Sequence, residues 1–249
     1  MIKFEQKNGI AIIKLNRPEK RNALHPVLIN DLKEKLNEIE YDKNIRILII
    51  TGEGSSFCAG ADLDYLNQLR KFSAIDNEKD ISSIAGLFLQ LYHFPKPTIA
   101  AVNGPAIAGG CGLATVCDFI IADELNAKFG YTEVKIGFIP AVVSIFLIKR
   151  IGEGNARQLL LSGELIDSWK AYEMGLANYL SKRVLEEAFN LANRLLENSD
   201  ASMELTKKMI NTVSLLNVDE AVNYCIELNI ISRSSEDFLK GLMQFLNKK

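Results

Sequence analysis

The sequence predicts an α/β domain followed by a helical tail. Two runs of apolar, β-branched residues, 45–50 and 98–102, are typical of strands that are buried on both faces. Segments with helical periodicity separate these strands, and this alternation favours an α/β core. After about residue 184 the strand signals end, and only amphipathic helical patterns follow.

The composition excludes several classes of protein. A chain of 249 residues suits one large domain, since domains commonly have about 100–200 residues. Lys and Arg number 29 and Asp and Glu number 31, so there is no basic excess of the kind that binds nucleic acid. The four cysteines form no CxxC pair and there are two histidines, so we expect no metal site. Reduced thiols and the absence of a secretory pattern in residues 1–5 predict a cytoplasmic protein.

The first elements are a hairpin and a helix. Residues 4–15 predict two strands joined by Asn8-Gly9, which is a strong signal for a tight turn. A polar loop over residues 16–24 follows. Pro26 then begins a helix, whose apolar face consists of Leu28, Leu32, Leu36 and Ile39.

The strand at residues 45–50 leads into a loop and two helices. A short helix is predicted over residues 62–70, with Asp62 near its N-terminus. Residues 73–80 are polar and are predicted to be mobile, and residues 81–92 predict the next helix.

Residues 98–122 contain one charged residue, Asp118, and are long enough to cross a bilayer. The sequence Asn103-Gly104-Pro105 interrupts this stretch, and three glycines lie in its middle. A buried strand, a glycine-rich turn, a helix over residues 109–117 and a strand over 119–122 fit better. We therefore expect no membrane span.

The tail contains four amphipathic helical patterns, at residues 184–196, 203–215, 219–231 and 236–246.

Two glycine-rich turns follow buried strands, at residues 56–62 and 103–112. Small residues let a ligand approach the backbone, and the first N–H groups of a following helix have no partner within it. Two such groups that point at one oxygen would form an oxyanion hole. Tight packing between strand and helix is the alternative explanation of the same glycines.

Glu133 is the only acid between Glu124 and Glu153, within an otherwise apolar stretch. Apolar surroundings raise the pKa of a carboxyl group, which suits proton transfer near neutral pH. A salt bridge to Lys135 or a helix-capping role are the alternatives.

Taken together, these segments resemble the enoyl-CoA hydratase/isomerase family, also called the crotonase family. The resemblance covers essentially the whole chain, from residues 16–24 through both glycine turns and Glu133 to residues 235–237. It implies a spiral of ββα units over residues 1–196. It also implies a helical C-terminal region over residues 197–249 that assembles a homotrimer or homohexamer. The implied partner is an acyl-CoA thioester substrate, with no cofactor besides the coenzyme A of that substrate.

The resemblance also assigns the site residues. The backbone N–H groups of Ala61 and Gly109 match the two donors of the family's oxyanion hole, and Glu133 matches a catalytic glutamate. The matched substrate-binding residues are Arg21, Ala23, Ala59, Asp62, Leu63, Gly110 and Gly112.

Gly112 stands where hydratases of this family commonly have a second glutamate. One hypothesis is hydration of a short-chain enoyl-CoA, with branched, methylglutaconyl-like substrates included, in which Glu133 is both base and acid. The pattern over residues 133–141 favours this hypothesis. The second is Δ3,Δ2-enoyl-CoA isomerisation with Glu133 as the single proton shuttle. The third is a non-catalytic acyl-CoA-binding protein.

Overall fold

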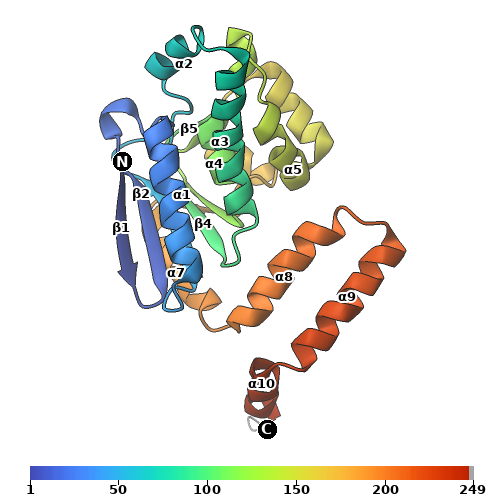
Figure 1. The fold of residues 1–249 in the computed structure, drawn as a ribbon. Coiled ribbons are helices and arrows are strands. Elements are labelled where there is room, and N and C mark those ends of the chain that lie inside the picture. Colours follow the sequence, from blue (N-terminus) through green and yellow to red (C-terminus); the bar gives the residue numbers. More distant parts are fainter. Residues whose placement is uncertain (247–249) are drawn as a thin grey trace.

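The computed structural model describes residues 1–246, which are built around a six-stranded sheet (Figure 1). Its strand order is β1-β2-β3-β4-β6-β9, and every neighbouring pair is parallel except the hairpin β1-β2. The strands are β1 (Ile2–Lys7), β2 (Ile10–Leu15), β3 (Ile47–Gly52), β4 (Thr98–Val102), β6 (Phe119–Asp123) and β9 (Tyr179–Ser181). A second sheet has the order β5-β7-β8, with β5 (Ala106–Ile107), β7 (Lys128–Gly130) and β8 (Ile166–Asp167).

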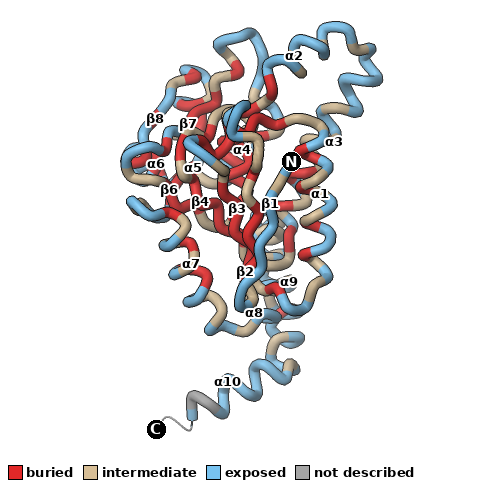
Figure 2. Tube along the Cα trace, turned by 90° about the vertical axis from the view of Figure 1, so that its left-hand side faces the viewer, coloured by how far each residue is buried: buried red, intermediate tan, exposed pale blue. Residues whose placement is uncertain are grey.

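Helices cover both faces of the large sheet. Successive strand residues point to opposite faces, so Ile13 and Leu48 join the core beneath α1 and α3, whereas Ile12 and Ile47 pack against α7. Figure 2 shows β3 and β4 in the buried centre of the molecule, whereas the edge strand β1 is mostly exposed. The three helices are α1 (Pro26–Tyr41), α3 (Ala74–Tyr92) and α7 (Val184–Leu195).

Shorter helices connect the strands around the glycine turns. The long helix α5 packs against α4 and is kinked at Gly152, whose φ of 75° lies outside the helical range. These elements are the 3₁₀ turns η1 (Pro18–Lys20) and η2 (Glu133–Ile136) and the helices α2 (Leu63–Leu69), α4 (Gly109–Thr115), α5 (Ala141–Ser162) and α6 (Ser168–Glu173).

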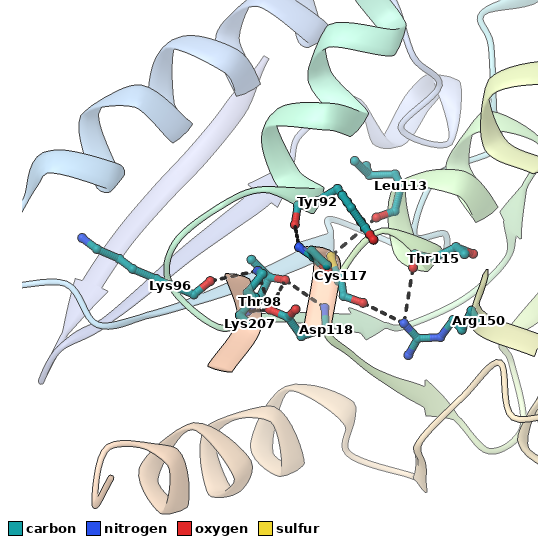
Figure 3. Close-up of polar contacts among 10 residues, drawn as sticks. Tyr92, Lys96, Thr98, Leu113, Thr115, Cys117, Asp118, Arg150 and Lys207 are labelled. Atoms are coloured by element: carbon teal, nitrogen blue, oxygen red, sulfur yellow. Dashed lines mark hydrogen bonds and ion pairs between the residues drawn. The ribbon is translucent and has the colours of Figure 1, made fainter. Parts of the chain in front are cut away.

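The C-terminal helices α8 (Asp200–Val213), α9 (Val218–Arg233) and α10 (Glu236–Leu246) extend away from the α/β body (Figure 1). Helix α8 is fastened to the core by Lys207, whose ammonium lies 2.7 Å from a carboxylate oxygen of Asp118 (Figure 3). Helix α9 packs on α8, and α10 packs on α9. No helix within residues 1–246 is both long and apolar enough to cross a membrane.

Most predicted elements are confirmed. Asn8 and Gly9 have φ angles of 51° and 82°, as a two-residue hairpin turn of type I′ requires. Asp62 caps α2, and the strands at residues 98–102 and 119–123 are present. The division of the chain at residue 196 stays a prediction.

Two predictions need correction, and one sheet was missed. Residues 73–80 are not a mobile segment, because α3 begins at Ala74 and the hydroxyl of Ser73 caps it by accepting from the N–H of Asp76. The strand predicted at 45–50 lies two residues later, at Ile47–Gly52. The strands of the small sheet were not predicted, because two or three residues carry no readable periodicity.

Candidate active site

Backbone hydrogen bonds join the first glycine turn, residues 56–62, to the loop that precedes α1. The N–H of Leu24 donates to the carbonyl of Gly60 at 2.7 Å, and the N–H of Asp62 donates back to the carbonyl of Leu24 at 2.9 Å. The N–H of Ala59 donates to the carbonyl of Arg21 at 3.0 Å. The loop before α1 and the first glycine turn, which both carry predicted substrate-binding residues, therefore form one continuous surface, called the wall below.

The two glycine turns touch each other through their backbones. A Cβ atom added to Gly110 would lie 2.1 Å from the carbonyl oxygen of Cys58, so no side chain fits there. A Cβ atom added to Gly60, whose φ is 88°, would lie 3.0 Å from Cβ of Ala108. The glycines thus serve close packing, and this packing brings the ends of both turns together.

Ala61 and Gly109 directly follow these contacting residues. Gly109 is the first residue of α4, where a backbone N–H has no acceptor within the helix. Within residues 1–246, neither the N–H of Ala61 nor that of Gly109 donates to a protein acceptor. Two uncommitted donors at adjacent turn ends can polarise a carbonyl oxygen of a ligand.

Glu133 begins η2, just after β7. Its side chain is 9% exposed, and its Oε2 atom is buried without a hydrogen-bond partner in the described part of the chain. Burial raises the pKa of this carboxyl group, although a hydrogen bond to its own backbone opposes the shift. Within residues 1–246 Glu133 forms no ion pair with Lys135, so the salt-bridge alternative lacks support.

The strand before Glu133 is joined to the strand before Gly109. Strands β5 and β7 are parallel neighbours, with Ala106 paired to Phe129. The N–H of Ala108 donates to the carbonyl of Gly130 at 2.7 Å. The turn that carries Glu133, called the acid turn below, and the second glycine turn therefore follow two paired strands of the same small sheet.

The family follows from comparison with known proteins. The family model described as "Enoyl-CoA hydratase/isomerase" matches residues 5–249. The chain belongs to the enoyl-CoA hydratase/isomerase family. It is therefore grouped with enzymes, and its fold is the crotonase fold predicted from the sequence.

Individual members of the enoyl-CoA hydratase/isomerase family are similar over their whole length. A Thermus thermophilus protein, provisionally named enoyl-CoA hydratase, is 39% identical over 246 residues, which are 98% of this chain and 97% of that protein. The crotonyl-CoA hydratase of Syntrophomonas wolfei is 32% identical over 99% of this chain and 95% of its own length. The solved enoyl-CoA hydratase of Polaromonas sp. JS666 superimposes with a TM-score of 0.95 at 30% identity, covering all of this chain and 97% of that one.

Gly112 faces side chains of neighbouring helices in this member of the enoyl-CoA hydratase/isomerase family. It is buried, and a Cβ atom at this position would lie 2.2 Å from Cγ1 of Val143 and 3.5 Å from Cζ of Phe88. A larger residue here requires that α5 or its side chains move. Contact between Gly112 and substrate stays a prediction.

Asp62 holds the loop and α2 together. Its Oδ1 atom accepts from the N–H groups of Asp64 and Tyr65, and its Oδ2 atom lies 2.8 Å from a guanidinium nitrogen of Arg17. Burial by itself would raise the pKa of Asp62, but Arg17 and the two N–H groups hold it below the ordinary value. Both oxygens of Asp62 are thus engaged with the protein.

Arg17 was not singled out in the sequence, although it lies within the segment that carries the family resemblance. It also donates to the carbonyl of Ala23 at 3.0 Å, so it fastens the loop that carries two predicted substrate-binding residues. Leu63 lies beyond this buried pair and is 76% exposed at the start of α2.

Arg150 is a second residue that sequence reasoning missed. From α5 it donates to the carbonyl of Cys117 at 2.7 Å and to that of Thr115 at 3.3 Å, at the C-terminal end of α4 (Figure 3). A cation at this end satisfies the last carbonyl groups of a helix. Arg150 therefore holds the helix whose other end begins at Gly109.

No group of three or more His, Cys, Asp or Glu side chains that could hold a metal ion occurs in residues 1–246.

Proposed function

We propose that the chain is an enoyl-CoA hydratase that adds water across the 2,3 double bond of a short-chain enoyl-CoA. The observation that carries this proposal is the buried, unpartnered Oε2 of Glu133, on a turn joined through β7 to the turn that ends at Gly109. The names of the similar proteins, crotonyl-CoA hydratase among them, support hydration as the reaction.

The reaction uses the two turns and one acid. The N–H groups of Ala61 and Gly109 donate to the thioester carbonyl oxygen, which draws electrons from the double bond. Glu133 takes a proton from water as the water oxygen bonds to C3. The electron pair of the C2–C3 double bond forms a double bond between C1 and C2, and the carbonyl π pair moves onto the thioester oxygen. The resulting enolate then takes the proton from Glu133 at C2, which restores the carboxylate. Each donor in such a hole lowers the barrier by about 3–4 kcal/mol in other enzymes.

The rest of the substrate is held by the wall formed by the first turn and the loop before α1. Arg21, Ala23, Ala59 and Leu63 are the proposed contacts of the coenzyme A portion, with Gly110 and Gly112 lying toward the acyl portion. Binding energy from the large remote portion of this substrate positions the reacting carbons.

Isomerisation is the second candidate, and the contact between Gly112 and Val143 favours it. Where hydratases of the family commonly have a second acid, this chain has a glycine covered by an apolar side chain. A single carboxylate suffices to take a proton from C2 of a 3-enoyl-CoA and to return it to C4. The same donors would hold the dienolate formed between the two steps.

Paired assays decide between these candidates. Purified protein is given crotonyl-CoA, with loss of the enoyl absorbance as the readout, and in parallel a 3-enoyl-CoA, with appearance of that absorbance. Turnover of crotonyl-CoA that disappears in Glu133→Gln supports the hydratase. Turnover of the 3-enoyl-CoA without turnover of crotonyl-CoA would contradict the hydratase and support the isomerase. Binding of both thioesters without turnover replaces both with an acyl-CoA-binding protein, and a branched methylglutaconyl-like thioester in the same assay tests branching.

We also propose that residues 197–249 assemble the chain into a homotrimer or homohexamer. Helices α8 to α10 carry many large apolar side chains that are at least 43% exposed, and such a surface is typical of an interface. Light scattering of the full chain during gel filtration tests this proposal, and a monomer at micromolar concentration would contradict it. The exposed side chains include Ile210, Val218, Val222, Ile226, Ile230, Ile231, Phe238 and Leu242.

The cytoplasm is the proposed location. The cysteines Cys58, Cys111, Cys117 and Cys225 are all free thiols, as a reducing compartment keeps them.

A further inference from the structure

Two buried hydroxyl groups join the acid turn to the helix that begins at Gly109. Tyr131 lies two residues before Glu133 and is fully buried. Its hydroxyl lies 2.8 Å from Oγ1 of Thr115, the last residue of α4, which is 4% exposed. This contact is the second link between the acid turn and the glycine turn, besides the ladder of β5 and β7.

The direction of this hydrogen bond is fixed by its neighbour. The hydroxyl of Thr115 donates to the carbonyl of Cys111, one helical turn earlier, at 2.8 Å. A hydroxyl group has a single proton to donate. Tyr131 must therefore donate to Thr115, which gives a chain from Tyr131 through Thr115 to the backbone of α4.

Tyr131 does not act as a proton donor in place of the second glutamate that is missing at position 112. Burial raises the pKa of Tyr131 well above its ordinary value, and burial raises the pKa of the nearby Cys111 thiol to about 12. Near neutral pH both groups stay protonated and exchange their protons poorly. A geometric role is the one that their surroundings favour.

We propose that Tyr131 is a positioning residue whose hydroxyl, through Thr115, sets the orientation of Glu133 toward the N–H of Gly109. This inference rests on the proposed function. The N–H of Ala108 holds Gly130 at the start of α4, and the hydroxyl pair holds Tyr131 at its end. Ala108 and Thr115 lie at opposite ends of this helix, and a rise of about 1.5 Å per residue separates the two links by about 10 Å along its axis. One link alone leaves the acid turn free to pivot, whereas two links fix its direction.

The test uses Tyr131→Phe, Thr115→Val and the double variant, all of nearly unchanged shape. Thr115→Val leaves the buried hydroxyl of Tyr131 without its acceptor and should have a lower Tm. In Tyr131→Phe the hydroxyl of Thr115 still donates to the carbonyl of Cys111, so the loss of Tm should be smaller. The double variant removes both polar groups and should recover most of the loss seen in Thr115→Val. We expect kcat to fall about 10-fold in each single variant, since small displacements of reacting groups are costly, while KM changes less than twofold. In the double variant kcat should stay about 10-fold low, because the link is still missing.

Ser168→Ala is the matched control. The hydroxyl of Ser168 is also buried and donates to the carbonyl of Glu124 at 2.7 Å, but it lies on α6. We expect a lower Tm with kcat unchanged.

A second readout for the Tyr131 and Thr115 variants is exchange of the C2 protons of butyryl-CoA with D₂O, which needs both the carbonyl donors and Glu133 but no double bond. This exchange should slow by the same factor as kcat.

Two results would overturn the inference. If kcat returns to the wild-type value in the double variant together with Tm, the pair has a structural role only. If the single variants keep wild-type kcat, the hydroxyl link does not orient Glu133. A wild-type protein that neither turns over an enoyl-CoA nor exchanges C2 protons removes the proposed function and this inference with it, so the two failures are distinguishable.

Discussion

Val143 occupies the space that a side chain on Gly112 would need: a Cβ atom there would lie 2.2 Å from Cγ1 and 3.0 Å from Cβ of Val143. Valine has no flexible end that can swing aside, and Phe88 closes the same space at 3.5 Å. The absence of a second glutamate is therefore matched by the packing of α5 and α3. This packing supports the proposal of a site with one acid, Glu133.

The first prediction follows from this packing. Gly112→Glu alone should be destabilised by about 1–3 kcal/mol, as is common when a core is overpacked, and should not gain hydratase activity. The double variant Gly112→Glu/Val143→Gly opens the space and should recover stability and raise crotonyl-CoA hydration above that of the Val143→Gly control. Urea unfolding and the absorbance assay measure both. A gain of hydration in Gly112→Glu alone would contradict the prediction, because it would show that Val143 and α5 move to make room for the new side chain.

The second prediction concerns Glu133 and its proton. Glu133→Gln should lower turnover by about 10²–10⁴-fold, the usual contribution of a general acid–base, because an amide does not exchange a proton at neutral pH. Binding of acyl-CoA should be nearly unchanged, as measured by calorimetry. In the wild type, kcat/KM should fall as the pH is lowered, because the reaction needs the deprotonated form of Glu133. This fall should occur at a higher pH than the ordinary pKa of a glutamate, because burial raises the pKa of Glu133.

Stability should show the same pKa shift with a definite sign. The folded protein holds the Glu133 proton more tightly than the unfolded chain does, so this residue lowers stability as pH rises from the ordinary glutamate pKa through the raised one. Glu133→Gln should therefore have a higher Tm than the wild type at neutral pH and a similar Tm in acid. A lower Tm at neutral pH would indicate that Glu133 has a structural role instead.

Local signals predicted much of this molecule. The turn at Asn8-Gly9, the cap at Asp62 and the buried strand at Thr98–Val102 each depend on neighbouring residues, so the sequence contains them directly. The isolation of Glu133 among apolar residues likewise predicted a buried acid, which the structure confirms.

Long-range contacts were beyond such reasoning. Nothing near Arg17 shows that its partner is Asp62, 45 residues later, and nothing near Gly112 shows that Val143 covers it. The hydroxyl of Tyr131 meets Thr115 only because β5 and β7 pair, and those strands are too short to detect. The family resemblance supplied the proposed residues of the site, and these stay a prediction, whereas the contacts that hold them in place could be seen only in the fold.

The third prediction tests the donor at Gly109. Gly109→Pro removes the N–H at a position where proline suits a helix, the first residue of α4. Turnover should fall by about 10²–10³-fold, as in other enzymes that lose one oxyanion donor. Gly109→Ala is the control that keeps the N–H, and its Cβ meets only the terminal methyl of Leu24 at 3.0 Å. Circular dichroism verifies that both variants fold, and equal activity in the two would argue against this donor.

The fourth prediction concerns the attachment of the tail. Lys207 of α8 joins Asp118, which also accepts from the N–H and hydroxyl of Thr98 at the start of β4 (Figure 3). Lys207→Met should lower the free energy of unfolding by about 1.5–3 kcal/mol, the usual value for a hydrogen bond to a charged group. Since α8 carries α9 and α10, the variant should also assemble less tightly in gel filtration with light scattering. Lys208→Met, an exposed neighbour on the same helix, should change neither property, and equal effects of the two substitutions would show that this ion pair does not hold the tail.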